Sequence, residues 1–432
     1  MNEPPTCQLL RQPNLLASPT VPSQEIPSVV ADTIENAFPR KDDRSRLRST
    51  PKIAIGVGSR GIANIDLIVK AVGDTFRGRG YQPFIVPAMG SHGGATQEGQ
   101  IATLQKLGIS EETVGLPIIG DMTTVQITNV DSLNIGIGVT SWQDDTLIFP
   151  IGRIKPHTGV VSPTTQSGLR KMLLIGFGKQ SYAAAYHSVA GTAGLGPVIE
   201  RGSEALVASG RVLGGLAIVE GPNHGTYLLE AIRAADFSTR EPKLLALANR
   251  LMPTFPSALP SIDILHLWQV GKPISGTSAD PNVTSKRLDG TSRVPGKGTT
   301  PIGVVCASNA HPDTAGNLVG VHLLDAVTDK LAQEIGPATF ENARASGSVK
   351  GAQPKLGLPD DESMIRWAFS NFEAGASFVS IRDTLHLGEM IVDSSTARSL
   401  RTSDEVEFVG KPFELRFEGG NLVNLWNEQP EQ

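Results

Sequence analysis

Short apolar runs alternate with longer mixed stretches along the first part of the chain. The run at 52–57 (KIAIGV) predicts a buried strand, and the stretch at 62–79 predicts a helix. A second pair follows, with a strand at 82–87 (QPFIVP) and a helix at 98–107. This β-α-β-α order is typical of a parallel α/β sheet. In such sheets, ligands bind at the carboxyl ends of the strands.

The alternation continues along the chain and indicates a second α/β domain. A Pro-rich stretch near residue 260 (PTFPSALPS) predicts the boundary. We therefore expect one α/β domain at 1–260, joined by the strands of 405–432, and a second at 261–404. Further strands are predicted at 7–10, 134–139, 145–150, 213–220, 262–267, 301–307 and 378–381, and further helices at 167–174, 181–190, 242–252 and 325–335.

The composition is that of a soluble globular protein and excludes several classes of function. Of the 432 residues, 39% are hydrophobic and 19% are charged. The net charge of -5 comes without a basic run, so we expect no nucleic acid partner. We recognise neither a membrane-spanning stretch nor a signal peptide. The two cysteines, Cys7 and Cys306, form no zinc or disulfide framework, which favours a cytoplasmic location.

Histidines lie in short Gly-containing segments, although the chain holds only eight of them. The loop GSHGGAT places His92 after the predicted strand at 82–87, and Arg60 follows the strand at 52–57. Glycines allow backbone amides to approach a ligand, and the start of the following helix favours an anion. A tight turn with a solvated His92 is an equally consistent interpretation.

Imidazole and basic side chains recur in one segment further along the chain. His157 follows a Pro and is expected to end a strand or to begin a loop. Considered by itself, His157 suits a structural role. Together with His92, it offers a pair of acid/base groups. Lys171 either faces water on a helix or supplies a nucleophilic or tethering amine, because neighbouring cations depress the pKa of an amine. His187 offers one ring nitrogen to a metal that needs other donors.

Taken together, these residues resemble the nickel-dependent lactate racemase superfamily of 2-hydroxyacid racemases and epimerases. The resemblance covers most of the chain, is strongest at 56–195 and recurs at GKPISGTSADPN. In that family a Lys tethers a nickel-pincer nucleotide, and a His sixteen residues later binds the nickel. Lys171 and His187 have this spacing. The GSHGG loop and the segment TGVVSPTTQSGLR depart from typical members and indicate a divergent branch. The fold implied is two α/β domains with an active-site cleft between them.

The resemblance also implies roles for the remaining polar residues. Arg60 matches the Arg that binds the substrate carboxylate, and His92 and His157 match the two acid/base histidines. Lys272, in GKPISG, is expected to add a cation for the substrate. The implied activity is that of an isomerase, a racemase or epimerase of a small-molecule hydroxyacid. It works by proton-coupled hydride transfer to and from the tethered nickel-pincer nucleotide, through a 2-keto acid intermediate.

The residues themselves leave other functions open. The same histidines can hold a divalent metal directly, with zinc as the alternative to nickel. Such a site suits a metal-dependent hydrolase or lyase of a small acidic substrate that uses no pincer cofactor. A non-catalytic binder of a nucleotide or an acidic metabolite is a third interpretation. The side chain of the hydroxyacid cannot be read from the sequence, and the oligomeric state stays open, a homo-oligomer included.

Overall fold

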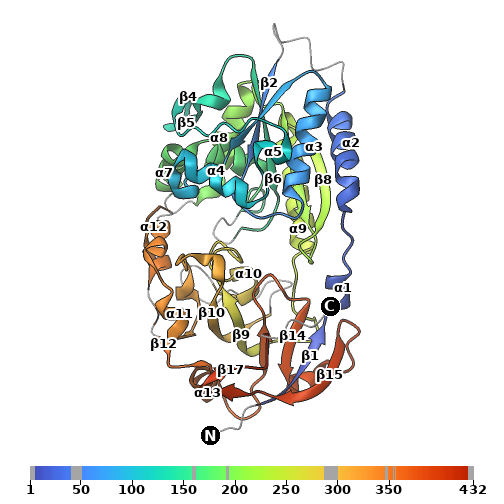
Figure 1. Ribbon diagram of the computed structural model, residues 1–432, viewed down its shortest axis with the longest axis vertical. Coiled ribbons are helices and arrows are strands. Elements are labelled where there is room, and N and C mark those ends of the chain that lie inside the picture. Colours follow the sequence, from blue (N-terminus) through green and yellow to red (C-terminus); the bar gives the residue numbers. More distant parts are fainter. Residues whose placement is uncertain are drawn as a thin grey trace. The chain divides into compact units, whose positions relative to one another are not determined.

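The chain folds as two compact α/β units, labelled by element in Figure 1. The computed structural model describes residues 5–39, 51–157, 162–190, 194–286, 300–345, 349–353, 355 and 357–426. The N-terminal unit is Pro19–Met252, and the C-terminal unit combines Pro253–Gln432 with Met1–Ser18. The prediction of two α/β units with parallel-rich sheets is confirmed.

The N-terminal unit contains a five-stranded sheet and a separate hairpin. Its strands are β2 (Lys52–Val57), β3 (Gln82–Pro87), β4 (Thr124–Val130), β5 (Leu133–Gly138), β6 (Thr146–Arg153), β7 (Gly214–Glu220) and β8 (Thr226–Arg233). The order in the sheet is β3-β2-β6-β7-β8, and β4 pairs with β5 in the hairpin. The first four strands of the sheet run parallel, and β8 is antiparallel to β7.

Helices cover both faces of this sheet. They are α2 (Ile26–Ala37), α3 (Ile65–Gly78), α4 (Gln97–Lys106), α5 (Glu111–Val114), α6 (Leu169–Lys171), α7 (Lys179–Ala190), α8 (Leu195–Ala208) and α9 (Phe237–Arg250), with a π-helical turn at Met172–Gly176. In β2, Ala54 packs into the apolar cluster that includes α7 to α9, whereas Ile53 and Ile55 pack with α2 and α3. This burial on both faces explains why the strands read as continuous apolar runs.

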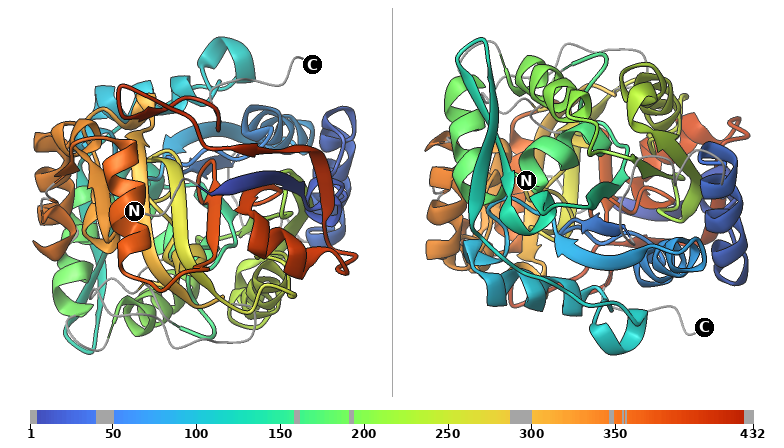
Figure 2. Two further views of the ribbon diagram at one scale, coloured as in Figure 1. Left: turned by 90° about the horizontal axis from the view of Figure 1, so that it is seen from below. Right: turned by 90° about the horizontal axis from the view of Figure 1, so that it is seen from above.

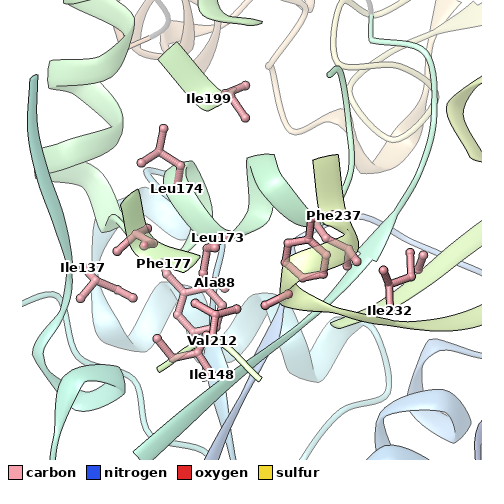
Figure 3. Packing of buried hydrophobic residues seen from close by; sticks show 14 of the residues in the cluster. Ala88, Ile137, Ile148, Leu173, Leu174, Phe177, Ile199, Val212, Ile232 and Phe237 are labelled. Atoms are coloured by element: carbon pink, nitrogen blue, oxygen red, sulfur yellow. The ribbon is translucent and has the colours of Figure 1, made fainter. Parts of the chain in front are cut away.

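The π-helical turn Met172–Gly176 lies very close to the strands. Figure 3 shows Phe177 and Ala88 within the apolar cluster that surrounds it. A Cβ atom on Gly56 would lie 2.3 Å from the Phe177 ring, and one on Gly176 would lie 2.5 Å from the carbonyl oxygen of Ala88. These glycines therefore allow the segment after Lys171 to dock where β2 and β3 end.

The C-terminal unit is built on an eight-stranded mixed sheet. Its strands are β1 (Thr6–Arg11), β9 (Ile262–Val270), β10 (Ile302–Ala310), β11 (Ala326–Thr328), β12 (Gly357–Leu358), β13 (Phe378–Ile381), β14 (Glu389–Asp393) and β15 (Glu407–Glu414), and β16 (Phe417–Glu418) pairs separately with β17 (Asn421–Leu422). The sheet order is β12-β11-β10-β9-β13-β14-β1-β15. The strands from β12 to β13 are parallel, and the others are antiparallel. The left view of Figure 2 shows β1, in blue, between β14 and β15.

Short helices flank the sheet of the C-terminal unit. They are α1 (Pro13–Leu16), α10 (Pro281–Thr284), α11 (Asp329–Gln333), α12 (Pro337–Ala345), α13 (Asp361–Ser370) and α14 (Ser394–Leu400). α13 buries Met364 and Ile365 against Ile264 of β9. Within the described ranges, no helix of either unit combines the length and the apolar character that a membrane span requires.

The assignment of residues to the two units differs from the expected one in two places. Phe255 and Leu259, in the Pro-rich stretch, pack into the core of the C-terminal unit, so this unit begins at Pro253 rather than after residue 260. The segment 405–432 was expected to join the N-terminal domain. Its strand β15 pairs instead with β1, and both belong to the C-terminal unit. Apolar runs predict strands, but they do not show which sheet a terminal strand will join.

Two predicted helices also differ from the observed elements. The segment 325–335 was expected to be a helix, but it begins with strand β11. Thr328 then caps α11 by accepting a hydrogen bond from the backbone N–H of Leu331. The helix expected at 242–252 begins earlier, at Phe237, and contains Pro242 in its second turn.

Candidate active site

Three of the predicted site residues follow three neighbouring parallel strands of the N-terminal unit. β3, β2 and β6 are adjacent in the sheet. His92 follows β3, Arg60 follows β2, and His157 follows β6. The carboxyl ends of parallel strands share one edge, and this edge is where α/β sheets bind ligands. The structure therefore brings these side chains to the same edge of the sheet.

The chain folds back after β6 and brings Lys171 toward this edge. Lys155 and Ser167 pair as an antiparallel bridge, with N···O distances of 3.3 and 3.2 Å. The backbone N–H of His157 donates to Oε1 of Gln166 at 2.6 Å. Because α6 starts at Leu169, directly after this bridge, Lys171 lies near His157 in space although fourteen residues separate them.

Positive and imidazole groups at the edge act on one another electrostatically. Burial and then the charge of Arg60 lower the pKa of Lys171 to about 7. Burial lowers the pKa of His157 well below its ordinary value, and Lys171, Arg60 and His187 lower it further. His187 is exposed on α7, yet the surrounding protein and then Lys171 lower its pKa as well. At neutral pH both histidines are therefore uncharged, and much of Lys171 is the free amine.

Arg60 places a permanent positive charge in the candidate site. Burial and the neighbouring Arg153 lower its pKa. A guanidinium nevertheless stays protonated at any physiological pH. Arg153 itself forms an ion pair with Glu220 at 2.7 Å, which offsets its charge. A guanidinium among neutral imidazoles and a partly neutral amine favours an anion, and its planar donors match a carboxylate.

A hydrogen bond from the β2 loop orients His92. The Ser59 hydroxyl and Nδ1 of His92 form a short hydrogen bond. Ser59 directly precedes Arg60, so a single loop supplies both the partner of the imidazole and the guanidinium. Ser59 was not among the site residues predicted from the sequence. Its place beside Arg60, after a predicted strand, was the available indication.

Glu241 supports the helix that carries Lys171. Its Oε2 accepts the backbone N–H of Arg170 at 3.1 Å, and burial raises its pKa to about 7. Arg170 does not face water, because it is only 3% exposed and its guanidinium donates to Glu204 at 2.8 Å and to Ser203 at 3.0 Å. Sequence reasoning missed Glu241 because it lies on α9, seventy residues away from Lys171.

The two remaining predicted site residues are Lys272 and His187. Lys272 belongs to the C-terminal unit, where its Nζ donates to the carbonyl oxygen of Gly276 at 3.0 Å and to Oδ1 of Asn342 at 2.9 Å. His187 lies in the last turn of α7. Among the described residues, no group of three or more His, Cys, Asp or Glu side chains is arranged to hold a metal ion.

Comparisons with known proteins show a likeness of fold. No family model matches the chain. No curated protein matches its sequence. Among solved structures, it is similar to the lactate racemase apoprotein from Thermoanaerobacterium thermosaccharolyticum, with a TM-score of 0.51 and 14% sequence identity. The match covers 84% of this chain and 92% of that one. At this identity the similarity establishes a shared two-unit α/β fold.

Proposed function

We propose that this protein is a racemase or epimerase of a 2-hydroxyacid that carries a nickel-pincer nucleotide on Lys171 and His187. The observation that carries the proposal is the proximity of Arg60, His157, Lys171 and His187. Besides burial, Arg60 lowers the pKa of Lys171, Lys171 and Arg60 lower that of His157, and Lys171 lowers that of His187. The likeness of fold to a lactate racemase agrees with it.

The chemistry of Lys171 and His187 fits a tethered metal nucleotide. Lys171 would hold the nucleotide through its neutral amine, and a pKa of about 7 provides that form at neutral pH. A neutral His187 would present a ring-nitrogen lone pair to the nickel. When bound, the nucleotide supplies the hydride chemistry at the substrate Cα that converts a 2-hydroxyacid to a 2-keto acid and back.

The other residues bind the substrate and move its proton. Arg60 binds the substrate carboxylate with two parallel hydrogen bonds. His157, kept neutral by burial and neighbouring cations, accepts the hydroxyl proton and readily returns it. His92, oriented by Ser59, serves the opposite face of the substrate. A reaction that runs in both directions between two enantiomers requires a base on each side. Lys272 is proposed as a further cation for the substrate.

A labelled substrate tests this function. Enantiopure 2-hydroxyacids carrying deuterium at Cα are incubated with protein from a host that makes the pincer nucleotide, and the products are separated on a chiral column. The account predicts interconversion of enantiomers with the deuterium retained, because a hydride that stays on the enzyme does not exchange with water. Washout of deuterium into water would indicate Cα deprotonation and contradict the mechanism. Failure to convert any acid in the panel would contradict the function.

Two variants separate the tethered-cofactor function from a metal site without a tether. Lys171→Met removes the amine while keeping an unbranched apolar stem, and it should abolish turnover. Lys106→Met, at an exposed position on α4, should leave turnover unchanged. A Lys171→Met protein that kept its activity would show that the amine carries no cofactor.

A further inference from the structure

Lys179 is a buried amine on a strained backbone. Its side chain is 2% exposed, and its φ of 54° lies in the left-handed region that favours glycine. A glycine would relieve the backbone strain here, and an apolar side chain would avoid burying an amine. The lysine at this position therefore suggests that the contacts of its ammonium group have a specific role.

The ammonium group of Lys179 contacts the base of the His92 loop. Nζ donates to the carbonyl oxygen of Pro87, the last residue of β3, at 2.8 Å. It also lies 3.4 Å from Oε1 of Gln100 on α4. The first contact fixes the start of the loop that follows β3. The second links Lys179 to Gln100, which in turn contacts the loop.

Gln100 connects Lys179 to the loop. Its side chain is fully buried, and its Nε2 donates to the carbonyl oxygens of Gly90 at 2.9 Å and of His92 at 3.3 Å. Because Oε1 faces Lys179, the amide can orient only one way, with Nε2 toward the loop. One amide therefore joins the lysine to the backbone on both sides of Ser91.

Lys179 keeps its charge through Asp121. Burial lowers the pKa of Lys179 to about 8, and the negative charge of Asp121 opposes this effect. Asp121 is held in turn by the Thr140 hydroxyl at 3.1 Å and by the backbone N–H of Thr123 at 2.8 Å. Below this pKa the ammonium is charged, and hydrogen bonds from a charged donor are shorter and stronger than those from a neutral one.

The chain segment that contains Lys179 also contains Lys171. Lys179 follows Lys171 by eight residues, and the π-helical turn Met172–Gly176 lies between them. The backbone N–H of Gly90 donates to the carbonyl oxygen of Gly176 at 3.2 Å. The His92 loop is thus bonded to the segment of Lys171 directly through its backbone, and again through Lys179 and Gln100.

We infer that Lys179 is a positioning residue that, through Gln100, holds His92 in place relative to Lys171. This inference rests on the proposed function, in which His92 moves a proton of the substrate while Lys171 carries the cofactor. Neither Lys179 nor Gln100 is assigned a contact with the substrate. Their role is to keep an acid/base group at a fixed distance from the reacting carbon, where a displacement of about 1 Å costs on the order of 100-fold in rate.

Lys179→Met is the first variant to test. It removes the donor and keeps an unbranched apolar side chain. We expect kcat to fall by about 10- to 100-fold and KM to change by less than about threefold, because Arg60 still binds the carboxylate. Hydrogen exchange of the backbone amides in 89–96 should become faster. The matched control is Lys106→Met, on the same helix as Gln100 but exposed, and it should leave kcat, KM and the exchange in 89–96 unchanged.

Gln100→Glu separates positioning from stability. The carboxylate gains a charge interaction with Lys179, but it places an oxygen where Nε2 donated to Gly90 and His92. We expect the melting temperature to stay within a few degrees of the wild-type value, while exchange in 89–96 accelerates and kcat falls. A role in stability alone predicts activity that follows the melting temperature instead.

Loop exchange is measured on the protein without substrate, so it does not depend on the proposed function. Faster exchange in 89–96 in both variants supports the connection even if no hydroxyacid is converted. Wild-type exchange in this segment for Lys179→Met and Gln100→Glu would overturn the inference, and so would a wild-type kcat for either variant in an active enzyme.

Discussion

The surroundings of Lys171 set the pKa of its amine. Burial and the charge of Arg60 bring its pKa from an ordinary 10.5 to about 7. Burial, followed by the charges of Lys171 and Arg60, likewise lowers the pKa of His157. Burial and the charge of Arg60 therefore both shift Lys171 and His157 toward their neutral forms.

The depressed pKa of Lys171 predicts a pH-dependent cost to stability. Between pH 7 and 10.5 the unfolded chain binds a proton that the folded chain has released, so wild-type stability rises with pH over this window. Lys171→Met removes the cost and should stabilise the cofactor-free protein at pH 7 by about 1–3 kcal/mol. Urea unfolding at pH 7 and at pH 10 measures the effect. The gain should shrink toward pH 10, and an equal gain at both pH values would contradict it.

Arg60→Met tests whether the charge of Arg60 lowers the pKa values of Lys171 and His157. Without its charge, the pKa values of Lys171 and His157 should both rise. The reaction of Lys171 with an amine reagent, followed against pH on cofactor-free protein, should then have its midpoint clearly above 7. Arg77→Met, at an exposed position that pairs with Asp74, is the control. An unchanged midpoint would show that burial alone sets the pKa of Lys171.

The sequence predicts several of the candidate site residues, but it does not predict the contacts that position them. Arg60 and His92 can be placed because they follow apolar strand runs, and the spacing of Lys171 and His187 carries the family resemblance. Ser59 also follows a predicted strand, but no local pattern indicates its role, and Glu241 could not be found in this way. Each acts through a hydrogen bond that exists only when distant segments are packed together, and local patterns do not encode such contacts.

At the scale of elements, α6 is too short to be stable by itself. It has three residues, and Glu241 on α9 accepts the backbone N–H of Arg170 within it. The π-helical turn that follows packs into the core beside Phe177. Tertiary contacts, rather than helix propensity, therefore fix the place of Lys171.

Glu241→Gln should flatten the acid side of the stability profile. The raised pKa of about 7 means that the folded chain holds a proton between pH 4.5 and 7 that the unfolded chain has lost. Wild-type stability therefore falls as pH rises through this window. Gln keeps the acceptor but does not titrate, so it should gain about 1–3 kcal/mol relative to wild type between pH 4.5 and 7. Thermal unfolding across this range measures it, with exposed Glu98→Gln as the control. Parallel profiles would contradict the assignment.

Elements with strong apolar patterns could be predicted, and those stabilised by partners could not. β2, β3 and β13 have the predicted bounds because most of their residues are buried. β4 was missed, since each of its residues is at least partly exposed and its pairing with β5 defines it. α2 was not predicted, although Ile26, Val30 and Ile34 repeat at the spacing that is typical of an amphipathic helix.

At the scale of the whole molecule, the start of the chain belongs to the unit formed by its end. β1 lies between β14 and β15, and Leu10 within it is fully buried in the core of the C-terminal unit. The N-terminal unit is by contrast a continuous stretch of chain, Pro19–Met252. The C-terminal unit therefore cannot complete its sheet without residues from the start of the sequence.

Leu10→Ala should destabilise the C-terminal unit selectively. Loss of a buried Leu side chain costs about 2–5 kcal/mol. Tryptophan fluorescence in urea reports this change, because Trp268, Trp367 and Trp426 lie in that unit and Trp142 lies in the other. Leu16→Ala, where the side chain is 47% exposed, should have a much smaller effect. A wild-type transition in Leu10→Ala would show that β1 contributes little to this unit.

The most direct test of the proposed function is the intact mass of the protein purified from a host that makes the pincer nucleotide, with metal analysis of the same sample. The account predicts a mass increase that peptide mapping assigns to Lys171, together with one nickel per chain. An unmodified mass, with zinc or no metal in the sample, would contradict the tethered cofactor and favour an enzyme that binds its metal directly.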